Sequence, residues 1–160
     1  MKKVGLIMGS DSDLPVVEKA VEQLKALEIP YEAHIFSAHR TPEETKDFAS
    51  TAEENGFGVL IAFAGKAAHL AGAVAAASIL PVIGVPVKSS TLDGLDALLS
   101  TVQMPSGIPV ATVAIDGAAN AAILAAQILA TEDEDLRKRL KDQRSKAKEK
   151  VLEKDGALEL

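Results

Sequence analysis

Residues 59–87, VLIAFAGKAAHLAGAVAAASILPVIGVPV, decide the fold class. Two short apolar runs, Val59 to Phe63 and Val82 to Val85, flank an alanine-rich run from Ala68 to Ala77. Both short runs are continuous rather than alternating, which is typical of strands buried on both faces of a parallel sheet. One lysine, one histidine and two prolines interrupt the stretch, so we interpret it as strand, helix and strand of a buried core rather than as a membrane span.

Strands and helices are expected to alternate on both sides of this stretch as well. Apolar runs predict further strands near Val4 to Met8, Tyr31 to Phe36 and Val110 to Ile115. Apolar periodicity predicts further helices near Leu14 to Leu27, Thr41 to Asn55, Leu92 to Ser100 and Ala118 to Leu129. Five strand–helix units predict an α/β fold, a three-layer, doubly wound parallel sheet with the flavodoxin-like strand order 2-1-3-4-5.

Two capping boxes predict helix starts. Thr41-Pro42-Glu43-Glu44 opens one helix with proline at its first position, and Gly56 is expected to end it. Thr131-Glu132-Asp133-Glu134 opens a highly charged last helix with a sparse apolar stripe. We therefore expect residues 1–160 to form a single domain in which residues 131–155 form a C-terminal extension helix. Such a helix covers its own subunit or extends across a neighbouring one.

Composition narrows the class of partner. A length of 160 residues is typical of a single domain, and a hydrophobic content of 48% is enough to form one substantial core. A formal net charge of -6 argues against nucleic acid and anionic membranes and favours a small-molecule ligand. The sequence has no cysteine, which excludes thiolate chemistry, and its first apolar run breaks at Gly9, too short for a signal peptide. We therefore expect a cytoplasmic location.

Polar clusters follow the ends of three predicted strands. They are Gly9-Ser10-Asp11-Ser12-Asp13, Ser37-Ala38-His39-Arg40 and Ala64-Gly65-Lys66-Ala67-Ala68-His69. Ligands of doubly wound sheets bind outside the carboxyl ends of the strands, so these clusters are expected to converge on one crevice.

The first cluster has two interpretations. Ser10, Ser12 and Asp13 precede a helix, where such residues often do no more than cap exposed N–H groups. Alternatively, the hydroxyls bind an oxyanion near the helix N-terminus and Asp13 accepts hydrogen bonds from a ribose. The cluster lacks both G-x-G-x-x-G and G-x-x-x-x-G-K-[ST], so neither a dinucleotide site nor an ATP P-loop is predicted.

The second cluster combines a proton carrier with a cation. His39 stands between Ser37 and Arg40, so it can transfer protons while the guanidinium holds a phosphate or carboxylate. A structural or solvated His39 is the alternative, although burial of Arg40 without an anion would be costly.

The other candidate side chains carry weaker signals. For His69, a hydrogen bond to a backbone carbonyl or a place at an interface is at least as well supported as a catalytic role. His34 lies inside a predicted strand and is expected to be structural. Lys66 is either a solvated charge or a ligand contact. The histidines lack metal-ligand spacing and no Ser-His-acid triad is evident, so no metal is required.

Several segments, in order over nearly the whole chain, resemble the PurE family, the N5-carboxyaminoimidazole ribonucleotide mutases of purine biosynthesis. They are Met8 to Asp13, Ser37 to Pro42, Ala67 to Leu70, Gly84 to Val87, Gln103 to Pro105, Gly107 to Val110 and Ala119 to Ala122. The resemblance implies a cofactor-free isomerase of class I that converts N5-carboxyaminoimidazole ribonucleotide to 4-carboxy-5-aminoimidazole ribonucleotide during IMP biosynthesis. It also implies a homo-octamer whose C-terminal segment contacts a neighbour, and a functional link to the ATP-dependent synthetase that forms the carbamate.

The resemblance also assigns roles to residues. His39 matches the family's proton-transfer residue. The matching ribonucleotide contacts are Ser10, Asp13 and Arg40, with Ser12 and Ser37 in addition and with the backbone of Ala64 and Gly65 near the migrating carboxylate.

Two positions depart from the family's usual pattern. Lys66 and Ala71 stand where members commonly carry glycine and proline. One alternative is therefore a carboxylase of the same fold that takes the unmodified aminoimidazole ribonucleotide and free carbon dioxide, although the segments around His69 and Met104 favour the mutase class. The other alternative is a non-catalytic nucleotide-binding module. A phosphoacceptor receiver is disfavoured because Ala64 and Gly65 occupy the place of its aspartate.

Overall fold

A computed structural model describes residues 1–90 and 92–158. Its described residues form a five-stranded, wholly parallel sheet with the strand order β2-β1-β3-β4-β5. The strands are β1 (Lys3–Met8), β2 (Tyr31–Ile35), β3 (Phe57–Gly65), β4 (Val82–Val87) and β5 (Ala111–Thr112). The predicted α/β class and the predicted strand order are confirmed.

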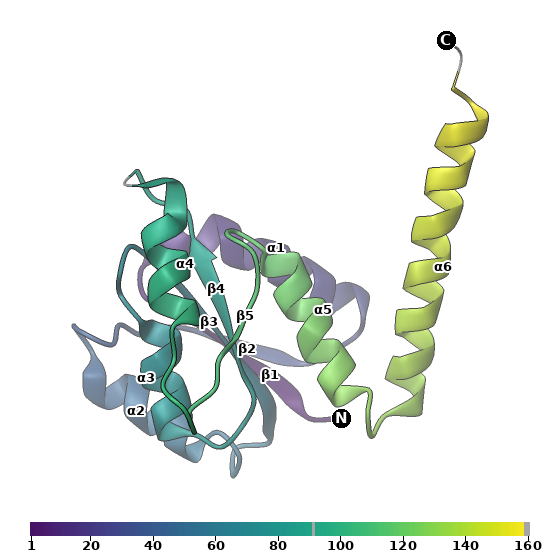
Figure 1. The fold of residues 1–160 in the computed structure, drawn as a ribbon. Coiled ribbons are helices and arrows are strands. Elements are labelled where there is room, and N and C mark those ends of the chain that lie inside the picture. The colour runs from purple at the N-terminus through teal and green to yellow at the C-terminus, as the bar shows by residue number, and fades with distance from the viewer. Residues whose placement is uncertain (91, 159–160) are drawn as a thin grey trace.

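Helices cover both faces of the sheet (Figure 1). One face carries α1 (Leu14–Ala26) and α5 (Ala118–Leu129), whereas the other carries α2 (Pro42–Thr51), α3 (Leu70–Ala77) and α4 (Leu95–Val102). Two short 3₁₀ turns, η1 (Asp11–Asp13) and η2 (Leu92–Gly94), precede α1 and α4. The three layers of the prediction are therefore present.

Two apolar cores lie between these layers, one on each face of the sheet. Strand β3 runs through the middle and is buried from Phe57 to Ala64. Side chains of β3 point alternately to the two cores, with Ile61 and Phe63 on the α1/α5 side and Leu60 and Ala62 on the α2/α3 side. The continuous apolar run that predicted a doubly covered strand is thereby explained.

The last strand is shorter than predicted. The sequence predicts a strand from Val110 to Ile115, but β5 comprises two residues. Val113 still donates its N–H to the Gly84 carbonyl (3.1 Å), after which the chain turns at Asp116, where φ is +55°. The Asp116 carboxylate accepts a hydrogen bond from the Lys88 N–H (2.8 Å), which fixes this turn against the end of β4.

Both predicted capping boxes are wrong in detail. Thr41 is the N-cap of α2, but its hydroxyl bonds the N–H and carbonyl of Ser37 instead of a helix N–H. The helix then ends at Thr51, and the chain turns on to Gly56, whose φ is +80°. At the last helix, Asp133 rather than Thr131 is the cap, because its carboxylate accepts the N–H of Leu136 (2.8 Å).

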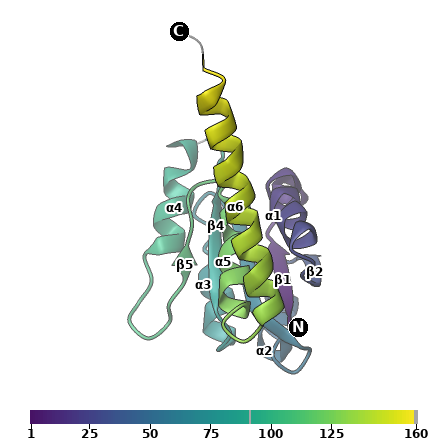
Figure 2. The same cartoon turned by 90° about the vertical axis from the view of Figure 1, so that its right-hand side faces the viewer.

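Helix α6 (Glu134–Gly156) leaves the body of the molecule (Figures 1 and 2). Its first turns rest on the same chain through the buried Leu136 and Leu140, and Arg139 Nε donates to the Leu27 carbonyl (2.9 Å). One turn further on, Gln143 Nε2 donates to Gln23 Oε1 of α1 (2.9 Å), and the rest of the helix then projects away from the sheet layers (Figure 1). Within the described residues, no helix is long and apolar enough to cross a membrane.

Candidate active site

A cavity of about 540 Å³ opens at the carboxyl ends of the central strands. All eight residues predicted for the site line it, namely Ser10, Ser12, Asp13, Ser37, His39, Arg40, Ala64 and Gly65. They come from the ends of β2, β1 and β3, which are neighbours in the sheet. The expected convergence of the three clusters is confirmed.

The end of β1 supplies hydroxyls, a helix N-terminus and a carboxylate. Ser10 Oγ accepts the Ser12 N–H (3.3 Å) and the Ser12 hydroxyl (3.0 Å), so the capping role holds for Ser10. Asp13 makes no side-chain cap bond to the described part of the chain. Its carboxyl is buried, and this desolvation raises its pKa above the usual range, against a hydrogen bond from the Ser10 backbone that lowers it.

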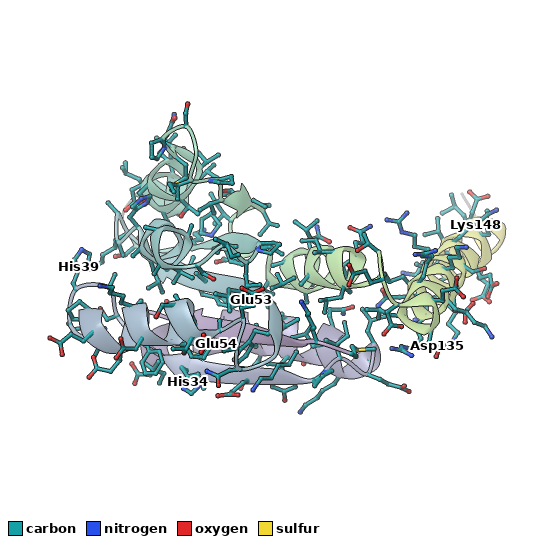
Figure 3. The ribbon with its side chains drawn as sticks, turned by 90° about the horizontal axis from the view of Figure 1, so that it is seen from below. His34, His39, Glu53, Glu54, Asp135 and Lys148 are labelled. Atoms are coloured by element: carbon teal, nitrogen blue, oxygen red, sulfur yellow. The ribbon has the colours of Figure 1, made fainter. Side chains whose placement is uncertain are left out.

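The end of β2 supplies the imidazole and a cation. Arg40 donates from Nη2 to the Gly9 carbonyl (2.6 Å) and from Nε to Ser37 Oγ (3.5 Å), so the guanidinium bridges the ends of β2 and β1. His39 is exposed at the cavity, at the end of the molecule opposite α6 (Figure 3). Arg40 is exposed too, so the burial penalty expected for it does not arise.

The end of β3 runs into a strained loop. Lys66 and His69 have φ values of +56° and +52°, in the left-handed region that side chains rarely adopt. The ring of His69 is hydrogen-bonded through Nδ1 to the Ser100 carbonyl, and the Ser100 hydroxyl donates to the Lys66 carbonyl (3.4 Å). His69 therefore bonds a backbone carbonyl, which is one of the three roles considered for it. Because His69 has this left-handed backbone, α3 begins at Leu70 instead of the predicted Ala68.

The site includes a fourth strand end, for which no site residue was predicted. Val87, Lys88 and Ser89, at the end of β4, line the same cavity. Lys88 Nζ lies 3.3 Å from Asp93 Oδ1, so a carboxylate partly offsets its charge. The parallel-sheet rule that selected the other clusters would have found these residues, because β4 adjoins β3.

His34 lies outside the cavity, as the prediction of a structural role requires. Its Nε2 is 2.9 Å from Glu32 Oε1, and its ring stacks on Phe36 with centroids 4.8 Å apart. Hydrogen bonds from Lys3 and His34 hold the pKa of the Glu32 carboxyl below its usual range. Figure 3 shows His34 well separated from His39.

The lining is suited to an anionic ligand that undergoes proton transfer. Arg40, Lys66 and Lys88 supply positive charge, and the N-terminus of α1 adds its backbone dipole. Among the described residues, no group of three or more His, Cys, Asp or Glu side chains could hold a metal ion.

Known proteins place this arrangement in a family. Residues 3–150 match the family described as AIR carboxylase. The N5-carboxyaminoimidazole ribonucleotide mutase of Pyrococcus abyssi is 57% identical over 92% of this chain and 85% of its own length. A phosphoribosylaminoimidazole carboxylase from Vigna aconitifolia chloroplasts is 53% identical over 98% of this chain but only 28% of its own length.

Solved structures agree with the sequence relatives. The crystal structure of Treponema denticola PurE superposes with a TM-score of 0.87 at 32% identity and covers 98% of each chain. Family match, relatives and superposition extend over the sheet and over the cavity at its edge. The chain belongs to the AIR carboxylase family, whose members include the N5-carboxyaminoimidazole ribonucleotide mutases.

Proposed function

We propose that this protein is an N5-carboxyaminoimidazole ribonucleotide mutase of purine biosynthesis. The observation that carries the proposal is the high identity to proteins of that name over nearly the whole chain. The cavity supports it, because its lining combines an accessible imidazole with cations and hydroxyls suited to a ribonucleotide. The reaction is an isomerisation that moves a carboxylate from the exocyclic nitrogen to a ring carbon, so no oxidant or reductant is consumed.

In the proposed mechanism His39 first acts as an acid and then as a base. The N–C bond of the carbamate breaks, its electron pair stays on nitrogen, and that nitrogen takes a proton from His39 as carbon dioxide is released. The ring carbon then attacks the trapped carbon dioxide, and His39 recovers the proton that this carbon loses. A single histidine suffices because the protons balance over the cycle, and a cavity that retains carbon dioxide prevents its loss to solvent.

The other predicted residues bind the substrate in this proposal. Arg40 and the N-terminus of α1 are placed to hold the phosphate, with Ser10 and Ser12 as hydroxyl donors. Asp13 accepts hydrogen bonds from the ribose. Its burial at the cavity favours a ligand whose hydroxyls replace the hydrogen bonds that water would otherwise donate to the carboxylate. The backbone of Ala64 and Gly65 lies beside the migrating carboxylate.

The experiment that tests the proposal compares two substrates at matched enzyme concentration. Ultraviolet absorbance follows formation of the carbon-carboxylated ribonucleotide from the carbamate, or from unmodified aminoimidazole ribonucleotide with bicarbonate. The proposal predicts faster turnover of the carbamate. Preference for free carbon dioxide would identify a carboxylase, as the Vigna aconitifolia relative is named, and no product from either would leave a nucleotide-binding module.

We also propose a homo-octameric assembly in the cytoplasm, supplied with the carbamate by an ATP-dependent synthetase. Exposed apolar side chains support self-association, because Leu95, Leu99 and Val102 share one face of α4, and Val151 and Leu152 are exposed on α6. Helix α6 carries nine basic and six acidic residues in a chain whose net charge is -6, so a neighbouring subunit offers it an acidic surface. Light scattering is expected to give eight times the chain mass of 16.7 kDa, whereas a monomer would contradict the octamer.

A further inference from the structure

Lys66 combines two features that distinguish it from the other cations of the cavity. It lies at the cavity, directly after β3, and its backbone is held in the left-handed region at φ +56°. A lysine at such a position costs stability that glycine would not. Strain of this kind persists at functional sites, where the side chain contributes something that glycine lacks.

The charge of Lys66 is also available to a ligand. Over residues 1–90 and 92–158, no carboxylate is within ion-pair distance of its ammonium, and the side chain is exposed. Lys88, by contrast, lies 3.3 Å from Asp93 Oδ1, and Arg40 is hydrogen-bonded to the Gly9 carbonyl (2.6 Å). An unpaired cation at a cavity attracts an anion more strongly than one that a neighbouring carboxylate already offsets.

The strand order separates Lys66 from Arg40. Arg40 follows β2 and Lys66 follows β3, with β1 between them. Because neighbouring strands are about 4.8 Å apart, the backbones at the ends of β2 and β3 are about 10 Å apart, and the Arg40 guanidinium extends from β2 to the Gly9 carbonyl at the end of β1. The ribonucleotide of the proposed reaction likewise has two anionic ends, a phosphate and a carboxylate, which are separated by a sugar and a five-membered ring.

We propose that Lys66 is a specificity-determining residue whose ammonium binds the migrating carboxylate, while Arg40 holds the phosphate at the other end of the cavity. This inference rests on the proposed function. It makes Lys66 the residue that distinguishes the carboxylated ribonucleotide from the unmodified one. The Ser100 hydroxyl supports this placement, because it donates to the Lys66 carbonyl (3.4 Å) and helps to fix the loop from α4.

The test compares the affinity of purified protein for two ribonucleotides, 4-carboxy-5-aminoimidazole ribonucleotide and its unmodified parent, by calorimetry. Lys66→Met is expected to weaken binding of the carboxylated ribonucleotide by about three- to tenfold and that of the parent by less than about twofold. Lys66→Arg is expected to restore the difference between the two ligands, and 1 M salt is expected to reduce it. Equal weakening of both ligands by Lys66→Met, or no weakening of either, would overturn the inference.

Two control variants separate charge from strain. Glu28 has the same left-handed backbone (φ +56°) but lies outside the cavity, so Glu28→Gly and Lys66→Gly are both expected to raise the melting temperature by about 1–3 °C. Only Lys66→Gly is expected to lose selectivity for the carboxylated ligand. Lys46→Met removes an exposed charge from α2 and is expected to leave both affinities unchanged.

The wild-type protein separates failure of this inference from failure of the proposed function. Wild-type protein that binds neither ribonucleotide would overturn the proposed function, and this inference with it. Wild-type protein that binds both, with a Lys66→Met variant that keeps the wild-type selectivity, would overturn the role of Lys66 alone.

Discussion

Two hollows lie at opposite ends of the same sheet, and they differ in chemistry more than in size. The cavity at the carboxyl ends has a volume of about 540 Å³ and is lined by serines, an aspartate, a histidine and cations. The hollow at the amino ends, about 380 Å³, lies between Lys2, Gly58, the last turn of α5 with Ile128 and Leu129, and the loop after it with Thr131, Glu132 and Asp133. The described residues that line it include charged side chains but no histidine and no arginine, so it lacks the proton carrier and the guanidinium that the carboxyl-end cavity combines.

Strained backbone conformations are also concentrated at the carboxyl ends of the strands. Among the described residues, six non-glycine positions have positive φ, and five of them follow the carboxyl end of a strand. Those five are Lys66, His69, Leu92, Asp93 and Asp116. Four of the five follow β3 or β4, and these two strands tolerate the strain because they are buried almost throughout. Burial in the interior of the sheet thus offsets the free-energy cost of the strained backbone at the carboxyl edge.

Truncation of the sheet interior is expected to have the largest effect on stability. Leu60 is fully buried in β3, between Gly58 at the amino-end hollow and Ala64 at the carboxyl-end cavity. Leu60→Ala is expected to lower the free energy of unfolding by about 2–5 kcal/mol, through lost burial and a residual void. Chemical denaturation measures this change. A loss below about 1 kcal/mol would contradict the claim that the interior stabilises both ends.

Two glycines, one at each end of the sheet, have no room for a larger side chain. A Cβ at Gly72 would overlap the ring of His69 beside the cavity, and a Cβ at Gly58 would come within 2.6 Å of Leu129 Cδ2 at the amino end. Either change to alanine is expected to cost about 1–3 kcal/mol of unfolding free energy. Only Gly72→Ala should also weaken ribonucleotide binding, since the displaced ring no longer holds the loop to the Ser100 carbonyl. Equal ribonucleotide affinity of the two variants would show that the loop held by His69 does not contribute to binding.

The smallest effect expected on stability is an increase. Burial raises the pKa of the Asp13 carboxyl in the folded protein, so folding favours its protonated form. Stability from this group is therefore complete below the unfolded pKa of 3.8 and is lost as the pH rises through the folded pKa. Asp13→Asn removes this loss and should modestly stabilise the protein at pH 7 but not at pH 3, while ribonucleotide affinity falls about tenfold. Destabilisation at pH 7 would show that the carboxylate contributes to folding.

The fold was predictable where burial alone determines structure. The continuous run Val59 to Phe63 predicts a strand covered on both faces, and β3 is such a strand. The short β5 was not predictable, because the path of the chain after it includes the contact between the Asp116 carboxylate and the Lys88 N–H, which joins parts of the chain 28 residues apart. The caps failed for a different reason, because local alternatives competed: the Thr41 hydroxyl bonds the backbone of Ser37, and Asp133 rather than Thr131 caps the last helix.

The site was predictable to the extent that topology positions it. Parallel strands bring Ser10, His39 and Gly65 to one edge, and the sequence predicts this from strand order alone. The exposed guanidinium of Arg40 and the left-handed backbone of Lys66 and His69 depend on contacts with Gly9 and Ser100. Such contacts leave no pattern in the local sequence.

The most direct test of the central claim measures turnover and binding together in a His39→Asn variant. Because His39 is exposed at the cavity, its replacement should leave the unfolding free energy and the ribonucleotide affinity close to their wild-type values. Turnover of the carbamate, followed by ultraviolet absorbance, is expected to fall by at least about 10²- to 10⁴-fold, since the proton carrier is gone. Conversion of the carbamate at the wild-type rate would contradict the account.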